Sequence, residues 1–133
     1  MRKRLKDLAA LVEGAEIAGD PQTVITDIVQ GSRQVSRGAM FVALTGAHTF
    51  ISAAVAKGAA AVLTETETTV PPGMAVLRVP CMKTALSIIV PAFWDYPGHA
   101  LRLIGITGTN GKTTTSYLIR AILRQAGKKT GLI

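Results

Sequence analysis

Hydrophobic and polar residues along the first half of the chain follow two periodicities. Residues 4–13 place leucine, alanine and valine at intervals of three and four, which predicts an amphipathic helix that ends at Gly14. Residues 23–29 are β-branched and partly alternating, which predicts a strand that leads into a turn. The short continuous apolar run at 40–44 is typical of a strand covered on both faces. A further helix is predicted over residues 50–57.

The same alternation of strands and helices continues to residue 98. Residues 60–64 and 74–79 predict two more short strands, and residues 83–96 predict a helix that Pro91 kinks or ends. Alternating strands and helices favour an α/β layered fold. Because Pro97-Gly98 interrupts the pattern, we expect one domain over residues 1–98 and a second over residues 99–133.

The second segment has the order strand, glycine-rich loop, helix. Residues 101–104 (LRLI) predict a strand, residues 105–116 read GITGTNGKTTTS, and an apolar stripe on the following residues predicts a helix that Gly127 stops. Residues 130–133 predict the beginning of another strand. We therefore expect here the first strand, loop and helix of a Rossmann-like P-loop ATPase domain.

The loop has the chemistry of a phosphate-binding site. Glycines allow backbone N–H groups to turn towards an anion, and the helix N-terminus adds partial positive charge. Lys112 would reach the terminal phosphates of ATP, and the Thr113 hydroxyl would bind Mg²⁺. The strict P-loop pattern is not met, since Ile106 stands where its first glycine would be. The alternative interpretation is an ordinary turn in which Thr109 or Asn110 caps the helix.

Three blocks of the sequence resemble the Mur ligase family. The loop TGTNGKTTT resembles the ATP-binding loop of these enzymes, and residues 31–44 (GSRQVSRGAMFVAL) resemble the "DSR…GxxFVAL" segment of their UDP-binding domain. Residues 50–62 (FISAAVAKGAAAV) resemble the segment that follows. The blocks are most similar to the ligase that adds the third residue of the stem peptide. The ligase that adds the D-Ala-D-Ala dipeptide is the alternative.

The resemblance implies two groups of functional residues. It assigns ATP binding to the loop, with Lys112 as the catalytic residue and Thr113 as the Mg²⁺ ligand; the set is Gly108, Thr109, Asn110, Gly111, Lys112, Thr113 and Thr114. It assigns UDP binding to two segments, and the residues are Gln30, Ser32, Arg33 and His48, with Gly46 and Ala47 beside His48. Without the resemblance, Ser32 would be a turn residue and Arg33 a solvated charge.

Two departures from the family pattern affect the UDP assignment. Gly31 replaces the usual aspartate of "DSR", which removes a carboxylate that could hold Arg33. The segment GAHTF is also shorter than the corresponding family loop, which makes His48 the weaker assignment.

Composition excludes several classes of protein. The chain has 133 residues and a net charge of +7, but its basic runs lie near the two ends and are not interleaved with aromatic residues. That distribution argues against a nucleic-acid-binding surface. A single cysteine rules out an internal disulfide, and no apolar run reaches the length of a transmembrane helix. We expect a cytoplasmic protein without a membrane partner.

The resemblance implies an ATP-dependent amide ligase of peptidoglycan synthesis. Its substrates would be UDP-N-acetylmuramoyl-L-alanyl-D-glutamate and an amino acid, diaminopimelate or lysine, joined through an acyl phosphate. The second domain is too short to enclose a core, so we expect an inactive N-terminal fragment of a protein that is monomeric at full length. A non-catalytic nucleotide-sugar-binding module is the alternative from another class. Folylpolyglutamate synthetase has a similar loop but lacks the block at 31–44.

Overall fold

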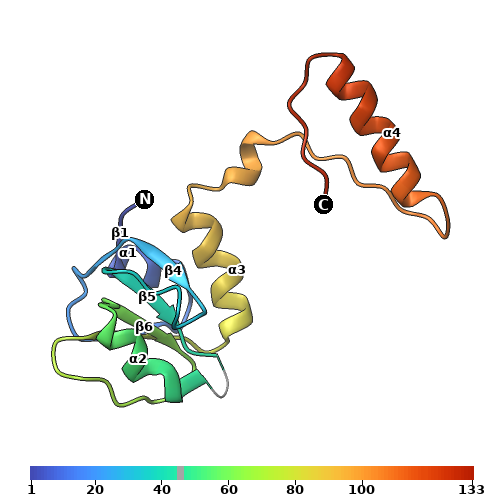
Figure 1. The fold of residues 1–133 in the computed structure, drawn as a ribbon. Coiled ribbons are helices and arrows are strands. Elements are labelled where there is room, and N and C mark those ends of the chain that lie inside the picture. The colour runs from blue at the N-terminus through green and yellow to red at the C-terminus, as the bar shows by residue number, and fades with distance from the viewer. Residues whose placement is uncertain (45–46) are drawn as a thin grey trace. The chain divides into compact units, whose positions relative to one another are not determined.

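The computed structural model describes residues 1–44 and 47–133, and it divides into two compact units (Figure 1). The first unit is Met1–Ala100 and the second is Leu101–Ile133. The division falls after Ala100, whereas the sequence pattern predicts a boundary after Gly98. Each unit is described by itself below.

The first unit is built on a mixed five-stranded sheet, which confirms the expected α/β fold. Its strands lie in the order β2-β7-β6-β5-β4, and β4 to β7 are parallel to one another while β2 is antiparallel to β7. The strand bounds are β2 Glu16–Ala18, β4 Asp27–Val29, β5 Ala39–Val42, β6 Ala61–Thr64 and β7 Ala75–Arg78. Two further strands, β1 (Lys3–Arg4) and β3 (Val24–Ile25), form a separate antiparallel pair.

Helices cover both faces of this sheet, and the strand residues alternate between them. Helices α1 (Leu5–Ala9) and α3 (Met82–Phe93) pack on one face with Met40 and Val42 of β5. Helix α2 (Ile51–Ala56) packs on the other face with Phe41. All three of these β5 side chains are fully buried, as expected for a strand covered on both faces.

Several elements differ in length from the sequence expectation. The helix expected over 4–13 is only Leu5–Ala9, because Lys3–Arg4 pair with β3 and the chain turns after Ala10. The strand expected over 23–29 is divided between β3 and β4, which belong to different sheets. Strand β2 was not expected; it is three residues long and half exposed, so its hydrophobic pattern is weak. The short helix before Gly58 is confirmed, preceded by a 3-10 turn at Ala47–Phe50.

Helix α3 passes through Pro91 and ends two residues later, at Phe93. The proline therefore lies in the last turn, where few helical hydrogen bonds depend on its missing N–H. Asp95 and Tyr96 follow with φ of 54° and 52°, the left-handed region, and a 3-10 turn spans Pro97–Ala100. The Lys3 ammonium lies 2.5 Å from the Asp95 carboxylate, so the start of the chain is tied to this bend.

The second unit contains one helix, α4 (Lys112–Gln125), and no strand within residues 101–133. The strands expected from Leu101 and over 130–133 are therefore not formed. A strand requires a hydrogen-bonded neighbour, and neither segment has one in the described chain. The apolar stripe of α4 is exposed: Leu118 is 59% and Ile122 68% accessible.

Candidate functional site

The glycine-rich loop ends in a helix N-terminus whose N–H groups are available to a ligand. Gly111 precedes α4 with φ 77° and ψ 0°, and no side chain caps the helix. The first helical hydrogen bond runs from Thr115 N–H to Gly111 O at 2.9 Å, so the amides of residues 112–114 have no acceptor within the helix. The first turn carries no acidic residue. This arrangement suits an anion, and the alternative with Thr109 or Asn110 as the cap is not formed.

Lys112 lies at the first position of α4 and folds back over the loop. Its ammonium group donates a hydrogen bond to the Gly108 carbonyl oxygen at 2.6 Å. Gly108 has φ 149°, a region that favours glycine, so this carbonyl position depends on the residue type. A phosphate that engaged Lys112 would replace this intraloop bond.

The other loop residues assigned from the sequence lie around the same helix start. Thr109 and Asn110 are exposed in the loop, and Thr113 and Thr114 are exposed in the first helical turn. The Thr113 carbonyl oxygen accepts a hydrogen bond from Ser116 Oγ at 2.7 Å. Among the described residues, the Thr113 hydroxyl has no hydrogen-bond partner. Residues 108–114 therefore form one continuous, solvent-accessible surface.

The second group of candidate residues lies at the carboxyl edge of the sheet. Strands β4, β5 and β6 are parallel and in register, so the residues that follow them come to one edge. Ligands of α/β proteins bind at this edge. The residues that follow β4 are Gln30, Gly31 and Ser32, and those that follow β5 and β6 are Ala43, Leu44 and Glu65.

The turn after β4 is held by backbone and side-chain contacts. Gln34 N–H donates to Gly31 O at 2.9 Å, and Lys57 Nζ donates to Arg33 O at 3.2 Å. Ser32 is half-buried while Gln30 and Arg33 are exposed. Within the described residues the Arg33 guanidinium forms no ion pair, consistent with the glycine in place of the usual aspartate.

The second segment assigned to UDP binding lies mostly outside the described residues. Residues 45–46 lie outside the described chain, and so do the side chains of Ala47 and His48. The expectations for Gly46, Ala47 and His48 stay predictions.

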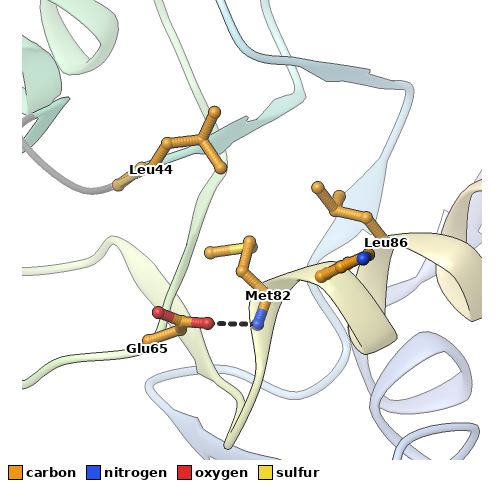
Figure 2. A pocket seen from close by; sticks show the side chains of 6 residues that line it. Leu44, Glu65, Met82 and Leu86 are labelled. Atoms are coloured by element: carbon orange, nitrogen blue, oxygen red, sulfur yellow. Dashed lines mark hydrogen bonds between the residues drawn. The ribbon is translucent and has the colours of Figure 1, made fainter.

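A cavity of about 390 Å³, which no sequence pattern predicts, lies at this same edge (Figure 2). Its wall is mostly apolar and carries one carboxylate and one ammonium group; the residues are Ala43, Leu44, Glu65, Met82, Lys83 and Leu86. The Glu65 carboxylate accepts a hydrogen bond from the Met82 N–H at the start of α3, as Figure 2 shows. Glu65 directly follows the strand predicted at 60–64, which is the one sign of it in the sequence.

Other chemical groups of the described chain do not form a site. Cys81 is exposed beside α3, and hydrogen bonds from Thr84 lower the pKa of its thiol. The described residues contain no group of three or more histidine, cysteine or acidic side chains that could hold a metal ion. None of the helices in the described part of the chain has the length and hydrophobicity to cross a bilayer.

Comparison with known sequences identifies relatives over nearly the whole chain. The family model described as Mur ligase middle domain matches residues 106–133. The UDP-N-acetylmuramoyl-L-alanyl-D-glutamate–2,6-diaminopimelate ligase of Geobacter sulfurreducens is 43% identical over 93% of this chain and 25% of its own length. The ligase of the same name from Bacillus licheniformis is 42% identical over 98% of this chain and 27% of its own length.

Solved structures give a similar result. The MurF structure from Acinetobacter baumannii has a TM-score of 0.69 at 29% identity, covering 94% of this chain and 28% of that one. A structure of a UDP-N-acetylmuramoyl-L-alanyl-D-glutamate–2,6-diaminopimelate ligase also has a TM-score of 0.69, at 30% identity over 96% of this chain and 26% of that one.

The chain spans about a quarter of the length of the curated relatives it matches. Sequence identity extends across both units, and the loop at 108–114 falls inside the matched family model. The chain therefore belongs to the Mur ligase family.

Proposed function

We propose that this chain is part of a ligase that adds diaminopimelate to UDP-N-acetylmuramoyl-L-alanyl-D-glutamate. It carries the binding site for the UDP moiety and the ATP-binding loop. The observation that carries the proposal is its identity of 42–43% to ligases of that name over nearly all of its length. Such a ligase is cytoplasmic and acts as a monomer. The amino acid that it adds is diaminopimelate rather than lysine, since the names of the relatives specify diaminopimelate.

We assign the ATP site to residues 108–114. The three amides of the first turn, which lack helical acceptors, support this role, and so does the absence of an acidic side chain. Lys112 would neutralise charge on the transferred phosphoryl group, and the unpartnered Thr113 hydroxyl would hold Mg²⁺. ATP would transfer its γ-phosphoryl group to the substrate carboxylate and leave as ADP, and the amine of the amino acid would then displace phosphate from the acyl phosphate to form the amide.

We assign the UDP moiety to residues 1–98 and the ATP loop to residues 99–133. Ser32 would donate a hydrogen bond to the base or phosphate, and Gln30, Arg33 and His48 would be further binding residues. The position of the Ser32 turn at the carboxyl edge of parallel strands supports this assignment.

Two other functions are less well supported. A ligase for the D-Ala-D-Ala dipeptide fits the fold equally well, since the MurF structure and the solved diaminopimelate ligase have the same TM-score and 29% and 30% identity. The identity of 42–43% to curated diaminopimelate ligases favours the diaminopimelate ligase. A non-catalytic nucleotide-sugar module would not need the Lys112-Thr113 pair at an uncapped helix start.

A chimeric enzyme tests the proposed function. This chain would replace the matching quarter of the Geobacter sulfurreducens ligase, and phosphate release from ATP would be measured in the presence of Mg²⁺, UDP-N-acetylmuramoyl-L-alanyl-D-glutamate and diaminopimelate. We expect ligation by the chimera and a loss of at least about a hundredfold with Lys112→Ala, because one electrostatic stabiliser of the transition state is removed.

Arg124→Ala, at the far end of α4, is the matched control and should leave the rate unchanged. A chimera that folds and binds UDP but turns over equally well with Lys112→Ala would contradict the loop assignment. A folded chimera that is active only with D-Ala-D-Ala would favour the alternative ligase.

A further inference from the structure

Glu65 has no role in the proposed function, although its carboxylate is held in a defined position. It directly follows β6 at the carboxyl edge and lines the cavity, and one of its oxygens accepts the Met82 N–H. In Figure 2 its second oxygen is free of this bond. Among the described residues, no other hydrogen bond to this carboxylate is formed. A carboxylate already fixed at one oxygen has little freedom left and presents the other in a defined position.

The chemistry of the cavity restricts what could bind beside Glu65. An ionised carboxylate only accepts hydrogen bonds, so it selects a group rich in donors. Phosphate oxygens are themselves acceptors and negative, and a uracil ring offers one N–H between two carbonyl oxygens. A ribose offers two adjacent hydroxyl donors, and a carboxylate after a parallel strand is a known way to bind them.

The rest of the cavity is compatible with the neighbouring parts of a nucleotide. Leu44, Met82 and Leu86 provide apolar surface, and Lys83 brings an ammonium group to the same wall. An apolar pocket with a few polar groups is the usual form of a small-molecule site. A diphosphate near Lys83 would balance its charge while the ribose met Glu65.

We propose that Glu65 binds the ribose hydroxyls of the nucleotide held at the carboxyl edge of the sheet. The proposal rests on the proposed UDP binding, and it adds a binding residue outside the Ser32 turn. Glu65 also holds the start of α3 in place, so its contact with ligand and its contact with Met82 must be separated by experiment.

Calorimetry with two ligands separates them. The full chain would be titrated with UDP and with 2′,3′-dideoxy-UDP, which lacks both hydroxyls. We expect the unmodified chain to bind UDP at least about tenfold more tightly than 2′,3′-dideoxy-UDP, because the lost hydrogen bonds are made to a charged group. In Glu65→Gln, which keeps an acceptor for Met82 N–H, this preference should fall at least threefold, and in Glu65→Ala it should disappear.

Glu67→Gln is the matched control, since Glu67 is an exposed glutamate two residues away that does not line the cavity. Its preference for UDP should equal that of the unmodified chain. If Glu65 only supports α3, its variants bind both ligands more weakly by the same factor and the preference for UDP persists. That result overturns the proposal. If the unmodified chain binds neither ligand, the proposed UDP site itself is wrong. Thermal unfolding of each variant confirms that it is folded.

Discussion

Two glycines in the first unit share one backbone conformation but have different surroundings. Gly38 and Gly73 both have φ of 88°. A Cβ on Gly38 would lie 2.8 Å from Thr26 Oγ1, whereas a Cβ on Gly73 would meet nothing within 4 Å. Alanine at Gly73 therefore suffers only backbone strain, and alanine at Gly38 suffers strain and a steric clash.

We expect Gly73→Ala to lower the free energy of unfolding by about 1 kcal/mol and Gly38→Ala by at least about 2 kcal/mol. Urea unfolding of the two variants measures the difference. Thr26→Ala removes the clashing atoms. It should therefore lower the free energy of unfolding less in the Gly38→Ala variant than in the unmodified chain. Equal costs at the two glycines would show that the Thr26 contact relaxes freely.

The Cys81 thiol should titrate below the usual range of cysteine. The side-chain hydrogen bond with Thr84 lowers its pKa, because that bond favours the thiolate. The rate of iodoacetamide labelling should consequently rise at a lower pH than for free cysteine. Thr84→Val should move the midpoint of the labelling profile to higher pH, and Thr84→Ser should preserve it. A profile that Thr84→Val leaves unchanged would show that the hydrogen bond is not formed in solution.

Single residues differ in how far the sequence could identify them. The loop residues 108–114 are contiguous, so their chemistry can be recognised from the sequence alone. Glu65 gives a weaker signal, because its place after a strand is visible in the sequence but its position in the cavity depends on Leu44 and Met82, which come from distant parts of the chain. Long-range proximity leaves no local signal.

At the scale of elements, the two long helices differ in how they are stabilised. In α3, Ile89 and Phe93 are fully buried, whereas in α4 no residue is buried. A helix of α4's length has only marginal stability in water unless one face packs.

We expect amide hydrogen exchange to distinguish these helices in the 133-residue chain. Exchange in α4 should be slowed by no more than about tenfold relative to an unstructured peptide. Exchange in α3 should be slowed by several orders of magnitude, since its opening requires unfolding of the first unit. Equal protection would show that the apolar stripe of α4 is covered in solution.

The elements themselves were predicted best where a buried run fixed both the type and the position. Strands β5, β6 and β7 and the helix before Gly58 agree with the sequence pattern. Helix α1 is shorter than its pattern because pairing of Lys3–Arg4 with β3 competes for its first residues. The strand expected from Leu101 has the right composition, but composition cannot provide the neighbour that a strand needs.

At the scale of the whole molecule, the loop at residues 108–114 is the only segment of the described chain to which we assign a role in phosphoryl transfer. Phosphoryl transfer needs the loop, a metal ion and a positioned nucleophile together. The described residues contain no cluster of acidic, histidine or cysteine side chains that could complete a metal site.

The 133-residue chain should consequently not hydrolyse ATP at a measurable rate. The measurement is the release of inorganic phosphate from ATP in the presence of Mg²⁺, with the active chimera as the positive control. Robust hydrolysis that Lys112→Ala abolishes would contradict this prediction, and it would indicate a self-sufficient nucleotidase.

The alternation of buried side chains along β5 separates the core of the first unit into two halves. Met40 and Val42 belong to the half that contains α1 and α3, while Phe41 belongs to the half that contains α2. Substitutions should therefore interact strongly within a half and add independently across the sheet. In evolutionary terms, each half can drift through its own series of compensating changes. A protein engineer can likewise redesign one half while the other preserves the fold.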